Sequence, residues 1–61
     1  MSNLKDLKKM RKAYERMLRA NIQRVEGAFD AGNYEQVKHA LVDCEANLGK
    51  IQWLSKLYME D

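Results

Sequence analysis

The chain has 61 residues with one cysteine, one histidine and no proline, and its formal net charge is +2. This length falls below the roughly 70–80 residues at which a single core usually suffices for stability. One cysteine excludes an internal disulfide, and one cysteine with one histidine cannot supply the about four ligands of a structural zinc site. We therefore expect stability to come from helix packing, most readily with a second chain.

The start of the chain and its hydropathy indicate where the protein resides. The polar start Met1-Ser2-Asn3 is followed by no apolar run, unlike a signal peptide. No apolar stretch approaches the roughly 18 residues of a membrane span. The single thiol suits a reducing compartment. We expect a soluble, cytoplasmic protein without a cofactor.

A first helix is predicted from about residue 3 to residue 30, within a single domain that covers residues 1–61. Ser2 or Asn3 can cap it, and Asp6 in the first turn complements the helix dipole. Its inward seam recurs at alternating steps of three and four residues: Leu4, Leu7, Arg11, Tyr14, Leu18, Asn21, Val25 and Ala28. Arg11 and Asn21 interrupt this apolar seam, and we interpret them as residues that control the register between helices.

The turn is predicted at residues 31–33. Gly32 can adopt the left-handed conformation that ends a helix, and Asn33 can cap the next one, with Gln36 completing a capping box. A second helix is predicted from about residue 34 to residue 59, with the alternative that Gly49 ends it early. Its seam has the same spacing: Tyr34, Val37, Leu41, Cys44, Leu48, Ile51, Ser55 and Tyr58.

Folding the two seams together at the turn predicts an all-α, antiparallel helical hairpin. The register that aligns the seams gives these facing pairs: Leu18 with Cys44, Asn21 with Leu41, and Arg11 with Ile51. Several layers then combine a large residue with a small one, as close packing requires. In this register we expect the Cys44 thiol to be buried and reduced.

More apolar surface remains than a two-helix hairpin can bury. Apolar residues flank the first seam: Met10, Met17, Ile22 and Phe29. A second set lies on the second helix about 120–180° from its seam: Val42, Ala46, Gly49, Trp53 and Leu57. Because a helix that is apolar on two sides is normally buried on two sides, we predict a homodimeric four-helix bundle, or a hairpin docked on another protein.

The second set, which we call the Trp53 patch, is the predicted partner-binding surface. Tryptophan is strongly enriched among binding hot spots because one side chain buries a large apolar area. The small residues Ala46 and Gly49 leave a shallow groove beside it, into which another helix can pack. The alternative is that this surface closes the homodimer.

Charge is distributed unevenly. Residues 1–29 carry eight basic and three acidic residues, a net charge of +5, and residues 30–61 carry three basic and six acidic residues, a net charge of −3. Most of the excess forms the basic stripe, within about 100° on the side of the first helix away from its seam: Lys5, Lys8, Lys9, Lys12, Arg16 and Arg19. This stripe is interpreted either as a solvated helix face or as a surface for nucleic-acid phosphates, an anionic membrane or an acidic protein. No aromatic residue interleaves with it, so base stacking is not expected there.

The hairpin, with its central turn and a cysteine in the second seam, resembles the Rop family of plasmid-encoded proteins. Local identities include Asp30, Ala31, Leu41, Asp43 and Leu48. The resemblance implies a dimeric four-helix bundle that binds paired RNA hairpins on a face of the first helix. Trp53 and Gly49 depart from the family pattern.

Catalysis is not expected. Ser2 and Ser55 are the only serines, threonine is absent, and no nucleophile–base set is recognisable. His39 lies one turn from Glu35 and from Asp43, which we interpret as surface charge pairing rather than a metal or acid–base site.

The sequence thus predicts a non-enzymatic interaction protein that inhibits, adapts or regulates a partner protein, of the kind carried as accessory regulators by phages and plasmids. The alternative is a Rop-like RNA-binding protein that uses the basic stripe, and a third reading is a peripheral membrane peptide.

Overall fold

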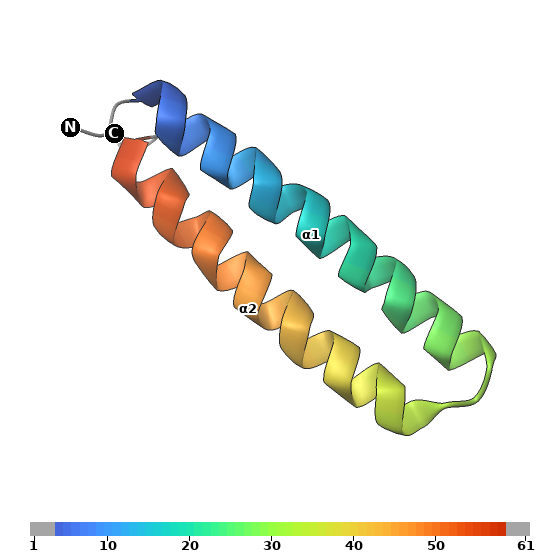
Figure 1. Cartoon of the computed structure of the whole chain (residues 1–61). Helices are drawn as coiled ribbons and strands as arrows, with labels where there is room; N and C mark the ends of the chain where they lie inside the picture. The colour runs from blue at the N-terminus through green and yellow to red at the C-terminus, as the bar shows by residue number, and fades with distance from the viewer. Residues whose placement is uncertain (1–3, 59–61) are drawn as a thin grey trace.

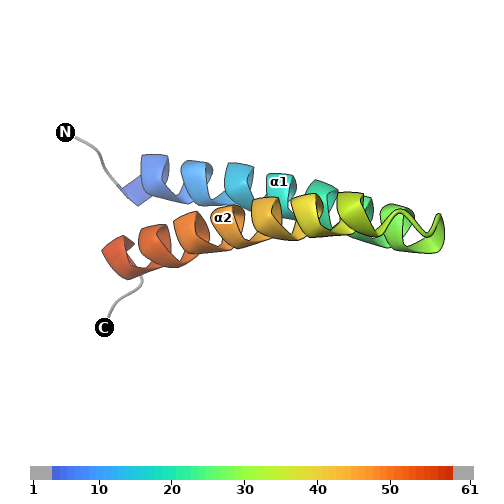
Figure 2. The ribbon, with the colours of Figure 1, turned by 90° about the horizontal axis from the view of Figure 1, so that it is seen from below.

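The computed structural model describes residues 4–58, and these form two α-helices. Helix α1 spans Leu4–Asp30 and helix α2 spans Tyr34–Tyr58, and they lie antiparallel and pack against each other (Figure 1). The molecule measures 45 × 17 × 15 Å, and its helices cross at a shallow angle (Figure 2). This confirms the predicted all-α hairpin. The predicted helix ends at residues 3 and 59 and the predicted N-cap at Ser2 or Asn3 lie outside the described residues.

The turn forms because Gly32 accepts a backbone conformation that other residues avoid. Its φ angle is 73°, and its N–H donates to the carbonyl of Phe29 at 3.0 Å. The N–H of Asn33 donates to the carbonyl of Ala28 at 2.9 Å, which completes a Schellman motif at the end of α1. The Asn33 Oδ1 atom accepts a bond from the N–H of Gln36 at 3.2 Å and so caps α2, as predicted. The predicted reciprocal bond of a capping box does not form, because the Asn33 N–H is already bonded to Ala28.

The predicted seam of α1 faces α2. Every seam residue from Leu7 to Ala28 is half-buried, whereas Leu4 is 51 % exposed. Arg11 extends over the end of α2, with its guanidinium carbon 5.6 Å from the centre of the Tyr58 ring. Its Nε atom also lies 3.5 Å from Oε2 of Glu15. The aliphatic stem of Arg11 therefore packs in the seam while its charge is met by an aromatic face and a carboxylate.

The predicted seam of α2 is wrong at three of its eight positions. Five seam residues are half-buried as expected: Val37, Cys44, Ile51, Ser55 and Tyr58. Leu41 and Leu48 are 51 % and 45 % exposed, and Tyr34 is exposed as well. The interface instead contains the three buried residues of the described chain: Ala40, Asn47 and Leu54. The helix also continues through Gly49 without ending.

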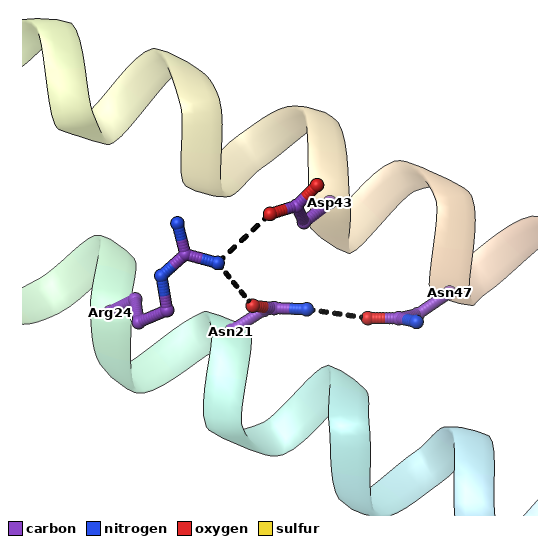
Figure 3. Close-up of polar contacts among 4 residues, drawn as sticks. All are labelled: Asn21, Arg24, Asp43 and Asn47. Carbon is purple, nitrogen blue, oxygen red and sulfur yellow. Dashed lines mark hydrogen bonds and ion pairs between the residues drawn. The ribbon is translucent and has the colours of Figure 1, made fainter.

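The helix register is set by a polar contact that replaces the predicted apolar one. Asn21 does not face Leu41; its Nδ2 atom donates to Oδ1 of Asn47 at 2.7 Å (Figure 3). Arg24 extends the network, because its Nη1 atom donates to Oδ1 of Asn21 at 2.7 Å and to Oδ2 of Asp43 at 2.9 Å. Arg11, which was predicted to face Ile51, lies over the Tyr58 ring. A buried amide must keep its hydrogen-bond partner, so this network favours one alignment of the helices over others.

Candidate functional site

The hairpin presents four surfaces, which follow from the helix period of about 100° per residue. The outer side of α1 carries the basic stripe, and the outer side of α2 carries the Trp53 patch. One broad face contains the polar network of Figure 3. The other broad face is apolar, because Ile22 and Leu41 each lie two residues, about 200°, from the network residues Arg24 and Asp43.

The structure exposes all five residues of the Trp53 patch. Trp53 itself is 53 % exposed and forms a shallow depression of about 490 Å³ with Ala46, Gly49 and Lys50. The Lys50 ammonium lies 5.8 Å from the centre of the tryptophan ring, within the range of a cation–π contact. Sequence reasoning had anticipated the depression beside Ala46 and Gly49 but not the contribution of Lys50.

The remaining two residues of the Trp53 patch lie outside this depression. Leu57 follows Trp53 by one helical turn and is 50 % exposed. Val42 is also exposed, but it lines the cavity on the apolar broad face. The five residues are thus exposed on one helix without forming a single pocket.

All six residues of the basic stripe are exposed. The ion pairs recorded within residues 4–58 involve Arg11, Arg24 and His39, so none of them uses a stripe residue. The stripe is therefore a row of cations along the outside of α1 without carboxylate partners among the described residues. Such a row attracts anions through its charge.

The apolar broad face contains a groove that the sequence analysis did not identify. This groove, which we call the interhelical groove, encloses about 790 Å³ between the helices and is lined mainly by apolar side chains: Leu18, Ile22, Val25, Leu41, Val42, Cys44 and Leu48. Glu26 and Glu45 stand at its rim. Its signal in the sequence is the set of apolar residues that flank the α1 seam, of which Ile22 is one. The predicted seam of α2 conceals the groove, because it places Leu41 and Leu48 inside the hairpin.

Two single residues that suggested chemistry have simple surroundings. Cys44 is a free thiol that lines the interhelical groove. It is half-buried, whereas the sequence predicted a buried thiol. The Nε2 atom of His39 lies 3.9 Å from Oε2 of Glu35 on an exposed part of α2, as the surface pairing predicted, whereas Asp43 pairs with Arg24 instead. Within residues 4–58, no three histidine, cysteine, aspartate or glutamate side chains gather in the manner of metal ligands.

Neither α1 nor α2 contains a stretch apolar and long enough to cross a lipid bilayer. Comparison of the chain with protein-family models, with curated proteins and with solved structures gives no match. The resemblance to the Rop family rests on the outline of the hairpin and the residues named above.

Proposed function

We propose that this protein is a non-enzymatic interaction module that forms a homodimeric four-helix bundle and binds a partner protein through the Trp53 patch, thereby inhibiting or adapting that partner. The observation that carries this proposal is the presence of two separate apolar surfaces on one small hairpin. The interhelical groove and the depression at Trp53 share no lining residue, so we assign a separate contact to each. One surface for self-association and one for a partner is the simplest assignment.

The Trp53 depression has the features of a protein-binding hot spot. A large, half-exposed aromatic ring stands beside two small residues, which leaves room for a side chain of a partner helix. The Lys50 ammonium lies 5.8 Å from the centre of the ring, so a cation–π contact favours this ring position before binding.

The test is a capture experiment from the source cell with the wild-type protein, followed by titration of any protein retained. We expect Trp53→Ala to weaken binding by about 2 kcal/mol or more, which is about 30-fold in the dissociation constant. Ile22→Ala is the matched control, because Ile22 is also an exposed apolar residue (44 %) but lines the interhelical groove. Nuclease treatment of the extract separates protein partners from those held through nucleic acid.

The proposal fails if Trp53→Ala and Ile22→Ala bind the captured partner equally well. It also fails if Trp53→Ala unfolds a chain that is shown to be monomeric, because Trp53 would then belong to the internal core. Circular dichroism of each variant separates a lost contact from a lost fold.

A second candidate function is RNA binding through the basic stripe, and the observation that favours it is the absence of carboxylate partners for its six cations among residues 4–58. Binding to a duplex RNA should weaken with salt by a slope of roughly one per phosphate contact. Replacing Lys8, Lys12, Arg16 and Arg19 with glutamine should abolish binding without loss of helicity. The control replaces Lys38, Lys50 and Lys56 on α2. No binding at low salt would leave the stripe as a solvated helix face.

A further inference from the structure

We infer that the interhelical groove holds a second copy of this chain, seated with both turns at the same end, so that α1 of one copy lies across from α2 of the other. The inferred arrangement rests on the dimer of the proposed function and adds to it the contact face and the orientation. Three observations support it: the surface area of the hairpin, the position of the groove along the helices, and the charges at the rim.

The single hairpin exposes more surface than a folded monomer of its mass should. The chain has a mass of 7.2 kDa and an accessible surface of 4861 Å². A compact monomer of that mass exposes about 4100 Å². The excess of about 750 Å² is close to the about 800 Å² that each partner buries in a standard protein interface. A second copy on one broad face is therefore of the right size to complete the fold.

The groove occupies the half of the hairpin nearer the turn. Two turns beyond Ile22 on α1 is Phe29, and two turns before Leu41 on α2 is Tyr34. The rings of Phe29 and Tyr34 lie 6.1 Å apart, centre to centre, so the apolar surface continues to the turn.

The same side of the hairpin is mostly polar away from the turn. Two turns before Ile22 lies Glu15, with Lys8 two turns further, and two turns after Leu48 lies Ser55. The exposed Leu4, five turns before Ile22, is the apolar exception on α1. Apolar surface is stabilised only when it meets apolar surface. Two copies with their turns at the same end place the apolar halves together. If two fully overlapping copies had their turns at opposite ends, the apolar half of each copy would lie against the polar half of the other.

The rim charges are complementary in this orientation. Arg19 lies two turns before Glu26 on one edge of α1, and Lys38 lies two turns before Glu45 on one edge of α2. Glu26 and Lys38 each lie six residues from Gly32, and Arg19 and Glu45 each lie thirteen residues from it. In this orientation α1 faces the other copy's α2 at the same distance from the turn. Glu26 of one copy can then approach Lys38 of the other, and Arg19 can approach Glu45. The net charges of the two helices also attract.

The contact face is tested by sedimentation equilibrium on a matched pair of variants. Leu48→Glu and Leu57→Glu make the same change at leucines of similar exposure (45 % and 50 %) on opposite sides of α2. We expect the wild type and Leu57→Glu to have about twice the chain mass at micromolar concentration, and Leu48→Glu to be monomeric. In the wild type, alkylation of Cys44 should slow at concentrations where the dimer forms, because the second copy covers the groove. This readout needs no substitution.

The orientation is tested with Ala31→Cys in a Cys44→Ala background. A short bismaleimide should link the two turns in high yield, whereas turns at opposite ends would be separated by up to the 45 Å length of the hairpin. Adding Leu48→Glu should abolish the link at the same concentration, which excludes random collision.

Several results would overturn the inference. A dimer lost in Leu57→Glu but kept in Leu48→Glu, or a dimer whose Ala31→Cys sites do not cross-link, overturns the face or the orientation alone. A wild-type monomer at all concentrations overturns this inference together with the proposed bundle. If partner binding does not depend on Trp53, the proposed partner site is overturned, but the inferred groove dimer is unaffected.

Discussion

The hydrogen bond between Asn21 and Asn47 can be removed by replacing either residue, and the two replacements should lower the free energy of unfolding by different amounts. Asn47 is 6 % exposed, and its Oδ1 atom accepts the 2.7 Å bond from Asn21, which is only half-buried. Asn21→Ala leaves a buried acceptor without a donor, which costs about 2–3 kcal/mol, and it also removes an acceptor from Arg24. Asn47→Ala leaves the Asn21 amide beside solvent, where water can replace the lost partner, so we expect a cost of about 1 kcal/mol.

Urea unfolding followed by circular dichroism measures this difference. For a small domain the free energy of unfolding falls by about 1 kcal/mol per molar urea, so the midpoints of the two variants should differ by about 1–2 M. Both substitutions give the same gain in helix propensity, which therefore cancels in the comparison. All samples need the same protein concentration, since a dimer makes the midpoint depend on concentration.

The double substitution Asn21→Leu with Asn47→Leu completes the experiment. Replacing both polar partners with apolar residues removes the desolvation cost, so stability should be near that of the wild type or higher, while the helices should lose their single alignment. Loss of dispersion in the amide NMR spectrum would report that second effect. Equal losses for Asn21→Ala and Asn47→Ala would refute the reasoning. So would a coupling energy near zero in the double-mutant cycle that the variant with both alanine substitutions completes.

Two further pairs of substitutions test the fold. Gly32→Ala should destabilise the hairpin by about 1 kcal/mol, because a φ of 73° is unfavourable for a residue with a Cβ atom. Gly27→Ala lies in open space within α1 and should stabilise the hairpin by about 0.5–1 kcal/mol. Thermal unfolding that shifts in the same direction for both variants would contradict this. Leu54→Ala should lower the free energy of unfolding by about 2–5 kcal/mol, because Leu54 is 0 % exposed. Leu57→Ala should lower it far less, because Leu57 is 50 % exposed. Similar unfolding midpoints for the two variants would show that α2 is rotated from the orientation described.

The sequence alone determined the features that depend on neighbouring residues. Gly32 and Asn33 mark the turn because only a few residue types suit those backbone positions, and both positions behave as predicted. The inward side of α1 was also predictable, since its apolar residues form one dominant stripe. The depression beside Trp53 could be anticipated because residues three and four apart on one helix must be neighbours.

Only the tertiary structure decided which side of α2 faces α1. Val37, Cys44, Ile51 and Tyr58 belong equally to two heptad seams, one completed by Leu41 and Leu48 and the other by Ala40, Asn47 and Leu54. Hydrophobicity favours the first seam, but α1 presents Asn21 at its centre, and a half-buried amide is stabilised by another amide rather than by a leucine. That pairing turns Leu41 and Leu48 outward and creates the interhelical groove. The choice depends on a contact between residues 26 positions apart, which no local pattern within α2 contains.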